Sequence, residues 1–213
     1  MSSRSLVIFD LDGTLIDSRL DLALSINLVR SSLGLPELPE PVVTGYLGDG
    51  IRNLVKRCFQ DVECNLDDVV KKYSDAYREH LLDNTTLYPN VKSTLDELAT
   101  AYNLCVVTNK PEPAAIKILK GLDIFDDFDA VIGGGRCQHL KPHPEPILKA
   151  IQETNSKQEG SWIVGDHRTD LKAAENTGLK SVFCKFGFGI MDTCIPDYSI
   201  ESFEELTKIL LNK

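Results

Sequence analysis

Two carboxylates separated by a single residue, Asp10 and Asp12, directly follow the apolar run from Leu6 to Phe9. The run predicts a β-strand, and ligands of an open parallel sheet bind beyond the carboxyl ends of its strands. Residues two apart in an extended chain face the same way, and Gly13 permits an abrupt turn before Thr14. Neighbouring carboxylates repel each other unless a cation binds or one is protonated. The pattern also suits an ordinary capped loop, so its meaning depends on the other strand ends.

Polar residues follow a second apolar run and precede a predicted helix. Thr108 and Asn109 follow the run from Leu104 to Val107, and a hydroxyl and an amide there can hold phosphate oxygens. Lys141 stands just before a segment that begins a helix with Pro144, so its charge can point at an anion near the sheet edge. Each feature alone is as typical of a turn or of a solvated lysine. Their common position beside a predicted sheet edge favours a shared site.

The apolar run from Trp162 to Val164 leads into Gly165, Asp166, His167 and, a little later, Asp170. Asp166 and Asp170 therefore bring two more carboxylates to the same edge. Oxygen donors without a cysteine or histidine cluster suit Mg²⁺ better than zinc. Asp166 is the predicted metal ligand, while Asp170 and His167 are expected to stand behind the ligands. Asp170 can also cap the helix that follows, and both roles are compatible.

Together these groups predict a site for phosphoryl transfer. Asp10 attacks phosphorus, and Asp12 protonates the leaving oxygen and then activates water. Mg²⁺, held by Asp10, the main-chain carbonyl of Asp12 and Asp166, draws charge off the phosphoryl oxygens. The remaining phosphate oxygens are expected to bind residues beside these carboxylates: Lys141, Thr108, Gly13, Thr14 and Asn109.

The elements that must position these residues alternate between strand and helix, which predicts an α/β fold with a parallel sheet. The strands are expected at 6–9, 104–107, 130–132, 162–164 and 181–183. Their nearly continuous apolar character is typical of strands covered on both faces. Helices are expected at 91–99, 113–122, 144–153, 169–177 and 202–212.

The segment between the first two strands breaks this alternation. It holds three expected helices, at 20–33, 51–59 and 69–82, and three prolines, Pro36, Pro39 and Pro41, that interrupt the chain. We therefore predict a core domain of residues 1–17 and 87–213 with an inserted helical domain of residues 18–86, hinged near 17–20 and 82–88. In the insert, the loop Gly48-Asp49-Gly50 can present backbone N–H groups to a substrate, and Arg52 can reach a substrate carboxylate. A plain helix connection and a solvated arginine are the alternatives.

Composition narrows the choice of partners. The formal net charge is −9, which argues against nucleic acid and anionic membranes as partners. No apolar run approaches a bilayer span, and no signal peptide is recognisable, so a cytoplasmic protein is expected. The six cysteines show no zinc spacing and are expected to be reduced. The sequence leaves open whether the protein is a monomer or a homodimer.

The four motifs, in this order, resemble those of the haloacid dehalogenase superfamily of phosphohydrolases. They lie at Asp10 to Thr14, at Thr108, at Lys141 and at Gly165 to Asp170. The resemblance implies a Rossmann-like core with a helical cap of the first subclass (C1), Mg²⁺ as cofactor and a small phosphorylated metabolite as substrate. One position departs from the pattern, since His167 stands where the family commonly has Ser or Thr.

Within the superfamily, the chain is similar to the bacterial phosphoglycolate phosphatases. The similarity covers Phe9 to Ser18, Gly48-Asp49-Gly50 with Arg52 and Leu54, Val106 to Pro111, Val131 to Gly134 and Lys141 to Pro146. It implies 2-phosphoglycolate as substrate. Related pyrophosphatases, sugar phosphatases and nucleotidases share much of this pattern. A sugar phosphomutase and a non-catalytic binding protein are further alternatives.

Overall fold

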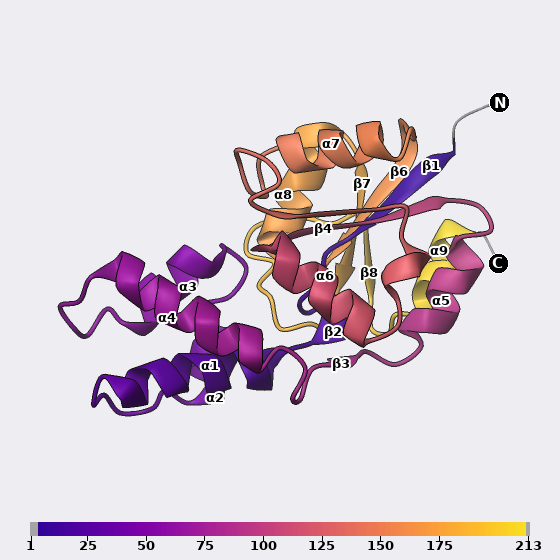
Figure 1. Cartoon of the computed structure of the whole chain (residues 1–213). Helices are drawn as coiled ribbons and strands as arrows, with labels where there is room; N and C mark the ends of the chain where they lie inside the picture. Colours follow the sequence, from indigo (N-terminus) through magenta and orange to yellow (C-terminus); the bar gives the residue numbers. More distant parts are fainter. Residues whose placement is uncertain (1–3, 212–213) are drawn as a thin grey trace.

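A computed structural model describes residues 4–211 of the chain, and a six-stranded sheet lies at its centre (Figure 1). The strand order is β5-β4-β1-β6-β7-β8, and every pairing in this sheet is parallel. The strands are β1 (Ser5–Phe9), β4 (Asn103–Pro111), β5 (Ala130–Gly134), β6 (Lys157–Gly165), β7 (Lys180–Cys184) and β8 (Tyr198–Ile200). All their carboxyl ends therefore meet at one edge.

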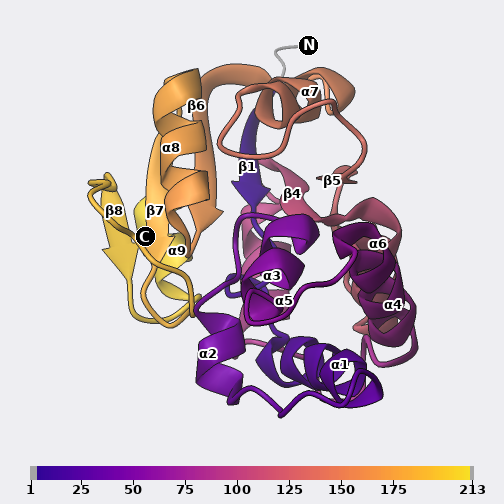
Figure 2. The same cartoon turned by 90° about the vertical axis from the view of Figure 1, so that its left-hand side faces the viewer.

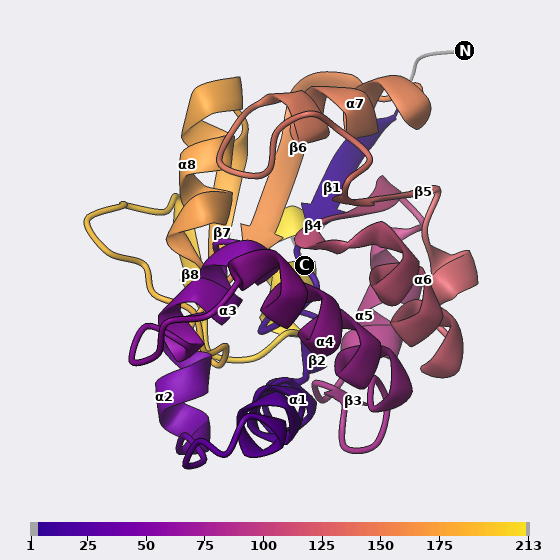
Figure 3. The same cartoon turned by 60° about the vertical axis from the view of Figure 1, so that its left-hand side comes forward.

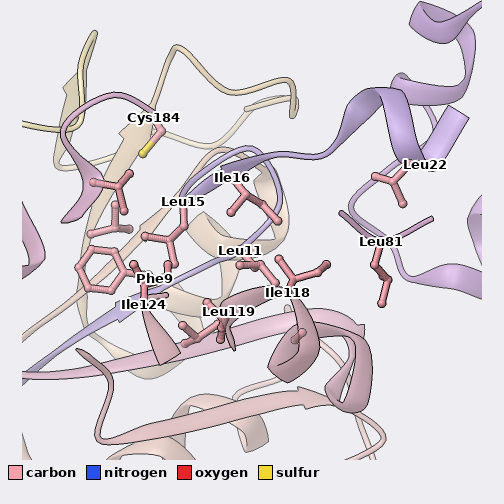
Figure 4. Close-up of a cluster of buried hydrophobic side chains, with 14 of the residues drawn as sticks. Phe9, Leu11, Leu15, Ile16, Leu22, Leu81, Ile118, Leu119, Ile124 and Cys184 are labelled. Carbon is pink, nitrogen blue, oxygen red and sulfur yellow. The ribbon is translucent and has the colours of Figure 1, made fainter. Parts of the chain in front are cut away.

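Alternation along β1 shows why the strand is apolar throughout. Leu6 and Ile8 pack with the residues of one buried cluster, whereas Val7 and Phe9 pack in another on the opposite face. Figure 4 shows Phe9 with Ile118, Leu119 and Ile124 in the second cluster. Because both faces of the strand are buried, the side chains on both faces are apolar.

Helices cover both faces of the sheet (Figure 2). On one side lie α7 (Glu145–Glu153) and α8 (Arg168–Thr177). On the other lie α5 (Val91–Leu98), α6 (Glu112–Gly121), the short helix η1 (Phe125–Asp127) and α9 (Glu205–Leu210). Helices on both faces leave the edge with the carboxyl ends as the open side.

A separate group of helices lies beyond that edge (Figure 3). It consists of α1 (Arg19–Ser32), α2 (Glu40–Thr44), α3 (Ile51–Cys58) and α4 (Leu66–Glu79). The chain enters it through β2 (Ile16–Asp17) and leaves through β3 (Thr86–Leu87), which pair antiparallel. At the same junction, the buried Asp21 accepts hydrogen bonds from Asn84 and Thr85, which ties the start of α1 to the returning chain.

The predicted fold class is confirmed, and all five predicted strands are present, each of them longer than expected. Five short elements were not predicted: α2, β2, β3, η1 and β8. α2 forms despite its prolines because Pro41 occupies the first turn, where a missing N–H costs nothing. β8 was missed because it is only three residues long. α4 begins earlier than expected, since Asn65 caps it by accepting from the N–H of Asp67.

The last helix ends at Leu210, and the predicted end at 212 lies outside the described residues. The division into two domains stays a prediction. Within residues 4–211, no helix combines the length and apolar character that a membrane crossing requires. All six cysteines are free thiols, as expected.

Candidate active site

A cavity of about 410 Å³ lies between the carboxyl ends of β1, β4 and β6 and the helices α3 and α4. Its floor is polar and its roof is largely apolar. The core contributes Asp10, Asp12, Thr108, Asn109, Lys110, Lys141, Asp166 and His167. The helical segment contributes Leu22, Leu47, Gly48, Gly50, Ile51, Leu54, Tyr73, Tyr77 and Leu81. Most of the predicted site residues thus share one enclosed space.

Asp10 extends β1 at the floor of the cavity. Its N–H donates to Val164 O at 2.9 Å, and its carboxylate pairs with Lys141 Nζ, also at 2.9 Å. Burial raises the pKa of Asp10 to about 6, against the opposing effect of Lys141. Lys141 is buried as well and donates to Asp170 Oδ1 at 2.7 Å and to Val107 O at 2.5 Å. Burial alone would lower its pKa, but the charges of Asp10 and Asp170 raise it above its usual range, so Lys141 is a fixed cation.

Asp166 directly follows β6, and it lines the same cavity as Asp10. Its Oδ2 accepts hydrogen bonds from the N–H groups of Phe188 and Gly189, at 3.0 and 2.7 Å. Burial, with the neighbouring charges of Asp10 and Asp170, raises its pKa well above the ordinary value. One carboxylate oxygen from each of these three aspartates lies within 4.8 Å of the others.

Crowded, buried carboxylates with raised pKa values need a cation to be ionised together. A set made only of oxygen donors fits Mg²⁺. Both oxygens of Asp170 accept hydrogen bonds, from Lys141 and from the His167 N–H, whereas Asp10 pairs with Lys141 through Oδ1 alone and the two N–H groups bind only Oδ2 of Asp166. Asp10 and Asp166 are therefore the side chains that could hold a metal. The predicted Asp12 carbonyl ligand stays a prediction.

Gly13 and Thr14 pack against Asp166. Gly13 has a φ of +83°, and a Cβ there would lie 1.9 Å from Asp166 Oδ2. The position therefore requires glycine for its backbone and for space. Thr14 is fully buried, with its hydroxyl 3.5 Å from Asp166 Oδ1, and it does not line the cavity.

Asp12 is held by two groups that the sequence analysis did not identify. Lys110 Nζ lies 2.6 and 2.8 Å from its two carboxylate oxygens, and Ser18 Oγ donates to Oδ1 at 2.5 Å. The signal for Lys110 was present, because Thr108 and Lys110 are two apart in β4 and so face the same way.

Thr108 and Asn109 differ in how they face the cavity. The buried Thr108 hydroxyl accepts from the Lys110 N–H at 3.2 Å and lines the cavity. The Asn109 amide also lines it, but its oxygen accepts from Lys141 N–H at 2.8 Å and its nitrogen donates to Lys141 O and Gly48 O. Asn109 thus positions the lysine and the helical segment in this structure.

The loop Gly48-Asp49-Gly50 contacts the core through several groups. A Cβ on Gly48 would lie 2.5 Å from His167 Cε1, so the imidazole packs directly on the glycine. Asp49 pairs with Arg168 of α8 at 2.8 Å and with Arg57 of α3 at 2.5 Å. Although burial opposes it, these guanidinium groups lower the pKa of Asp49. Gly48 and Gly50 line the cavity, whereas Asp49 does not.

His167, where the family pattern has Ser or Thr, caps the start of α8. Its ring nitrogen accepts from Thr169 N–H, and Asp170 accepts from the His167 N–H in return. Burial and the nearby Arg168 lower its pKa. Arg52 does not line the cavity: it pairs with Asp67, and both side chains are largely exposed. The structure therefore does not bring Arg52 to the place where it was predicted to act.

The fold and this arrangement define the class of protein. Residues 7–184 match the family model described as haloacid dehalogenase-like hydrolase, so the chain belongs to that family and is a phosphatase within it. It is 34% identical over 211 residues to the phosphoglycolate phosphatase of Aquifex aeolicus, covering 97% of this chain and 96% of that one.

Two further comparisons point to the same branch. The phosphoglycolate phosphatase of Neisseria meningitidis is 37% identical over 213 residues, covering 94% of this chain and 91% of that one. The crystal structure of a predicted phosphoglycolate phosphatase from Haemophilus somnus 129PT superimposes with a TM-score of 0.90 at 33% identity. That match covers 98% of this chain and 99% of the other.

Proposed function

We propose that this chain is a Mg²⁺-dependent phosphatase that hydrolyses 2-phosphoglycolate through an aspartyl-phosphate on Asp10. The observation that carries the proposal is the floor of the cavity, where Asp10, Asp166, Lys141 and Thr108 surround one space. A nucleophile, an oxygen-donor metal site, a fixed cation and a hydroxyl are what phosphoryl transfer asks of a protein.

Asp10 supplies the carboxylate oxygen that attacks phosphorus, while the ester oxygen leaves with a proton from Asp12. Asp10 and Asp166 would hold Mg²⁺, which would withdraw charge from the phosphoryl oxygens. Lys141 holds Asp10 in place and offers its charge to the same oxygens. Thr108 donates its hydroxyl to one of them.

Asp12 then takes a proton from water, which attacks the phosphoaspartate and releases inorganic phosphate. Asp10 is regenerated as a carboxylate. The apolar roof from α3 and α4 excludes bulk water during the transfer, and the β2–β3 ribbon is the proposed hinge for its opening.

The substrate follows from two lines of support. The relatives that cover nearly the whole chain are named phosphoglycolate phosphatases. The cavity lies near the lower end of the range for small-molecule sites, which suits a small metabolite. Free thiols at all six cysteines support a cytosolic location.

The test is phosphate release from a panel of esters with and without Mg²⁺. The panel contains 2-phosphoglycolate, pyrophosphate, sugar phosphates and nucleoside monophosphates. We expect 2-phosphoglycolate to give the highest kcat/KM and chelation of the metal to abolish turnover. A hexose 1-phosphate that isomerises without net phosphate release would instead indicate a mutase.

Asp10→Asn is the decisive variant, with Asp123→Asn as the matched control at an exposed aspartate. Removal of a covalent nucleophile costs on the order of 10⁴-fold or more in kcat, whereas the control keeps its activity. Trapping with a fluoride mimic of the phosphoryl group would be lost in Asp10→Asn. Undiminished turnover in Asp10→Asn would rule Asp10 out as nucleophile.

A further inference from the structure

Lys110 is a buried cation on the floor of the cavity that the proposed chemistry does not use. Its side chain is only 4% exposed. Among the described residues, it is one of four lysine and arginine side chains that line the cavity. Arg78 and Lys117 lie at the exposed rim, and Lys141 is occupied by Asp10, Asp170 and Val107 O. The Lys110 ammonium, by contrast, hydrogen-bonds with one residue of the described chain, Asp12, so a second group of the substrate can bind this buried charge by replacing a single partner.

Tyr77 of α4 faces Lys110 from the helical side. The lysine Nζ lies 4.8 Å from the centre of the tyrosine ring. Tyr77 lines the cavity, is 5% exposed, and its buried hydroxyl has no hydrogen-bond partner within residues 4–211. A buried donor without a partner costs free energy, and a ligand that accepts from it removes this cost.

The present partner of Lys110 is Asp12, the proposed acid/base group. The ammonium contacts both oxygens of Asp12, and Ser18 donates to Oδ1 as well. A leaving ester oxygen or an attacking water must therefore share the oxygens of Asp12 with the ammonium. Movement of Lys110 to another anion would open Asp12 to these groups.

We propose that Lys110 and Tyr77 form the binding site for a second anionic group of the substrate, a carboxylate close to the phosphoryl group. The carboxylate replaces Asp12 as the partner of the Lys110 ammonium, and it accepts a hydrogen bond from the unpartnered Tyr77 hydroxyl. Binding of an acidic tail therefore frees the acid/base group. The substrate class is phosphate esters of small hydroxy acids, and the inference rests on the proposed phosphatase function.

This site also links the two sides of the cavity. Lys110 belongs to β4 in the core, whereas Tyr77 belongs to α4 in the helical segment. A carboxylate held by both contacts the floor and the roof together. An ester with a neutral tail provides no such link and leaves Lys110 on Asp12.

The experiment compares 2-phosphoglycolate with ethyl phosphate, which has a methyl group in place of the carboxylate, at saturating Mg²⁺. In Lys110→Met, which keeps the length of the side chain, we expect kcat/KM for 2-phosphoglycolate to fall by about 100-fold. For ethyl phosphate we expect kcat/KM to rise, because the substitution removes the ammonium that stays on Asp12 when no carboxylate binds it, so the preference between the two esters collapses. Lys110→Arg should keep most of the preference.

Tyr77→Phe is the second variant, since it keeps the ring beneath Lys110 and removes only the hydroxyl. We expect it to lower kcat/KM about ten-fold for 2-phosphoglycolate alone, mainly through KM. If both variants lose the same factor on both esters, Lys110 only orients Asp12 and the proposal is wrong.

A binding measurement separates this outcome from failure of the proposed function. Calorimetry on Asp10→Asn, in which no turnover interferes, should show tighter binding of 2-phosphoglycolate than of ethyl phosphate. The added Lys110→Met substitution should remove the difference. Absence of turnover by the wild-type protein on any ester would contradict the phosphatase proposal, whereas equal binding of the two esters would contradict this one.

Discussion

The floor and the roof of the cavity are built from different contacts. On the floor, each charged group has its partners at fixed distances: Lys141 binds Asp10 and Asp170, and two N–H groups hold Asp166. The roof is made largely of leucine, isoleucine and tyrosine side chains. Its polar contacts with the core include those of the loop Gly48-Asp49-Gly50 and one from Lys117, which donates to Arg78 O. Preorganised charges suit a reaction step, whereas an apolar roof held by few polar contacts suits opening and closing.

The difference predicts where substitutions act. Changes on the floor should alter kcat, because they displace groups that contact the reacting atoms. Changes in the roof should alter KM and selectivity, because they affect how the substrate is enclosed. Three substitutions test this division, and the first two have a matched control variant elsewhere in the chain.

Gly13→Ala should have the largest effect of the three. The new Cβ would lie 1.9 Å from Asp166 Oδ2, so the carboxylate that we propose as metal ligand must move. A displacement of about 1 Å in a catalytic group costs on the order of 10²-fold, and we expect such a loss in kcat. Steady-state kinetics and Mg²⁺ titration of the variant measure it.

Gly135→Ala is the matched control for backbone strain. Gly135 has a similar φ of +94°, but a Cβ there meets nothing within 4 Å. Both alanines carry the cost of the left-handed backbone, about 1–2 kcal/mol. Only Gly13→Ala should lose kcat, and an equal loss in both would mean that backbone strain, not Asp166, explains it.

Arg168→Ala should have an intermediate effect, on KM. Arg168 of the core pairs with Asp49 of the loop, and with 30% and 16% of the side chains exposed the pair contributes only about 1 kcal/mol. We expect KM for 2-phosphoglycolate to rise about five-fold with little change in kcat. High salt should weaken the same contact and raise the KM of the wild-type protein.

Arg57→Ala is the control because Arg57 also pairs with Asp49 but belongs to the helical segment itself. A double-mutant cycle of Arg168→Ala with Asp49→Ala should show coupling in KM. If Arg168→Ala lowered kcat as much as Gly13→Ala, the Arg168–Asp49 contact would affect the reaction step itself. That result would contradict the division between floor and roof.

The floor was largely predictable from the sequence, for a geometrical reason. Parallel strands end at one edge, so residues after separate strands, such as Asp10, Thr108 and Asp166, converge wherever the strands pair. Lys110 was missed because the strand was expected to end at Val107, whereas β4 continues to Pro111. Because the strand stays extended to Pro111, Lys110 faces the same side of the sheet as Thr108. Lys110 was therefore missed because the end of this strand was predicted too early.

The roof was less predictable because it depends on how helices pack. The sequence identified the loop at Gly48, but nothing in it indicated that Asp49 would face Arg168, 119 positions later in the chain. The hydrogen bonds of Asp166 with Phe188 and Gly189 are equally non-local. Such contacts are set by tertiary packing, which local patterns do not encode.

Arg52→Ala should have the smallest effect and is the sharpest test of the structure against the sequence pattern. The sequence predicted that Arg52 binds a substrate carboxylate, whereas the structure places it in an ion pair with Asp67, with 62% and 75% of the two side chains exposed. Exposed pairs contribute little, so kcat/KM for 2-phosphoglycolate should change by less than about two-fold. A loss as large as that of Lys110→Met, confined to 2-phosphoglycolate, would mean that the roof rearranges on binding and that Arg52, not Lys110, meets the carboxylate.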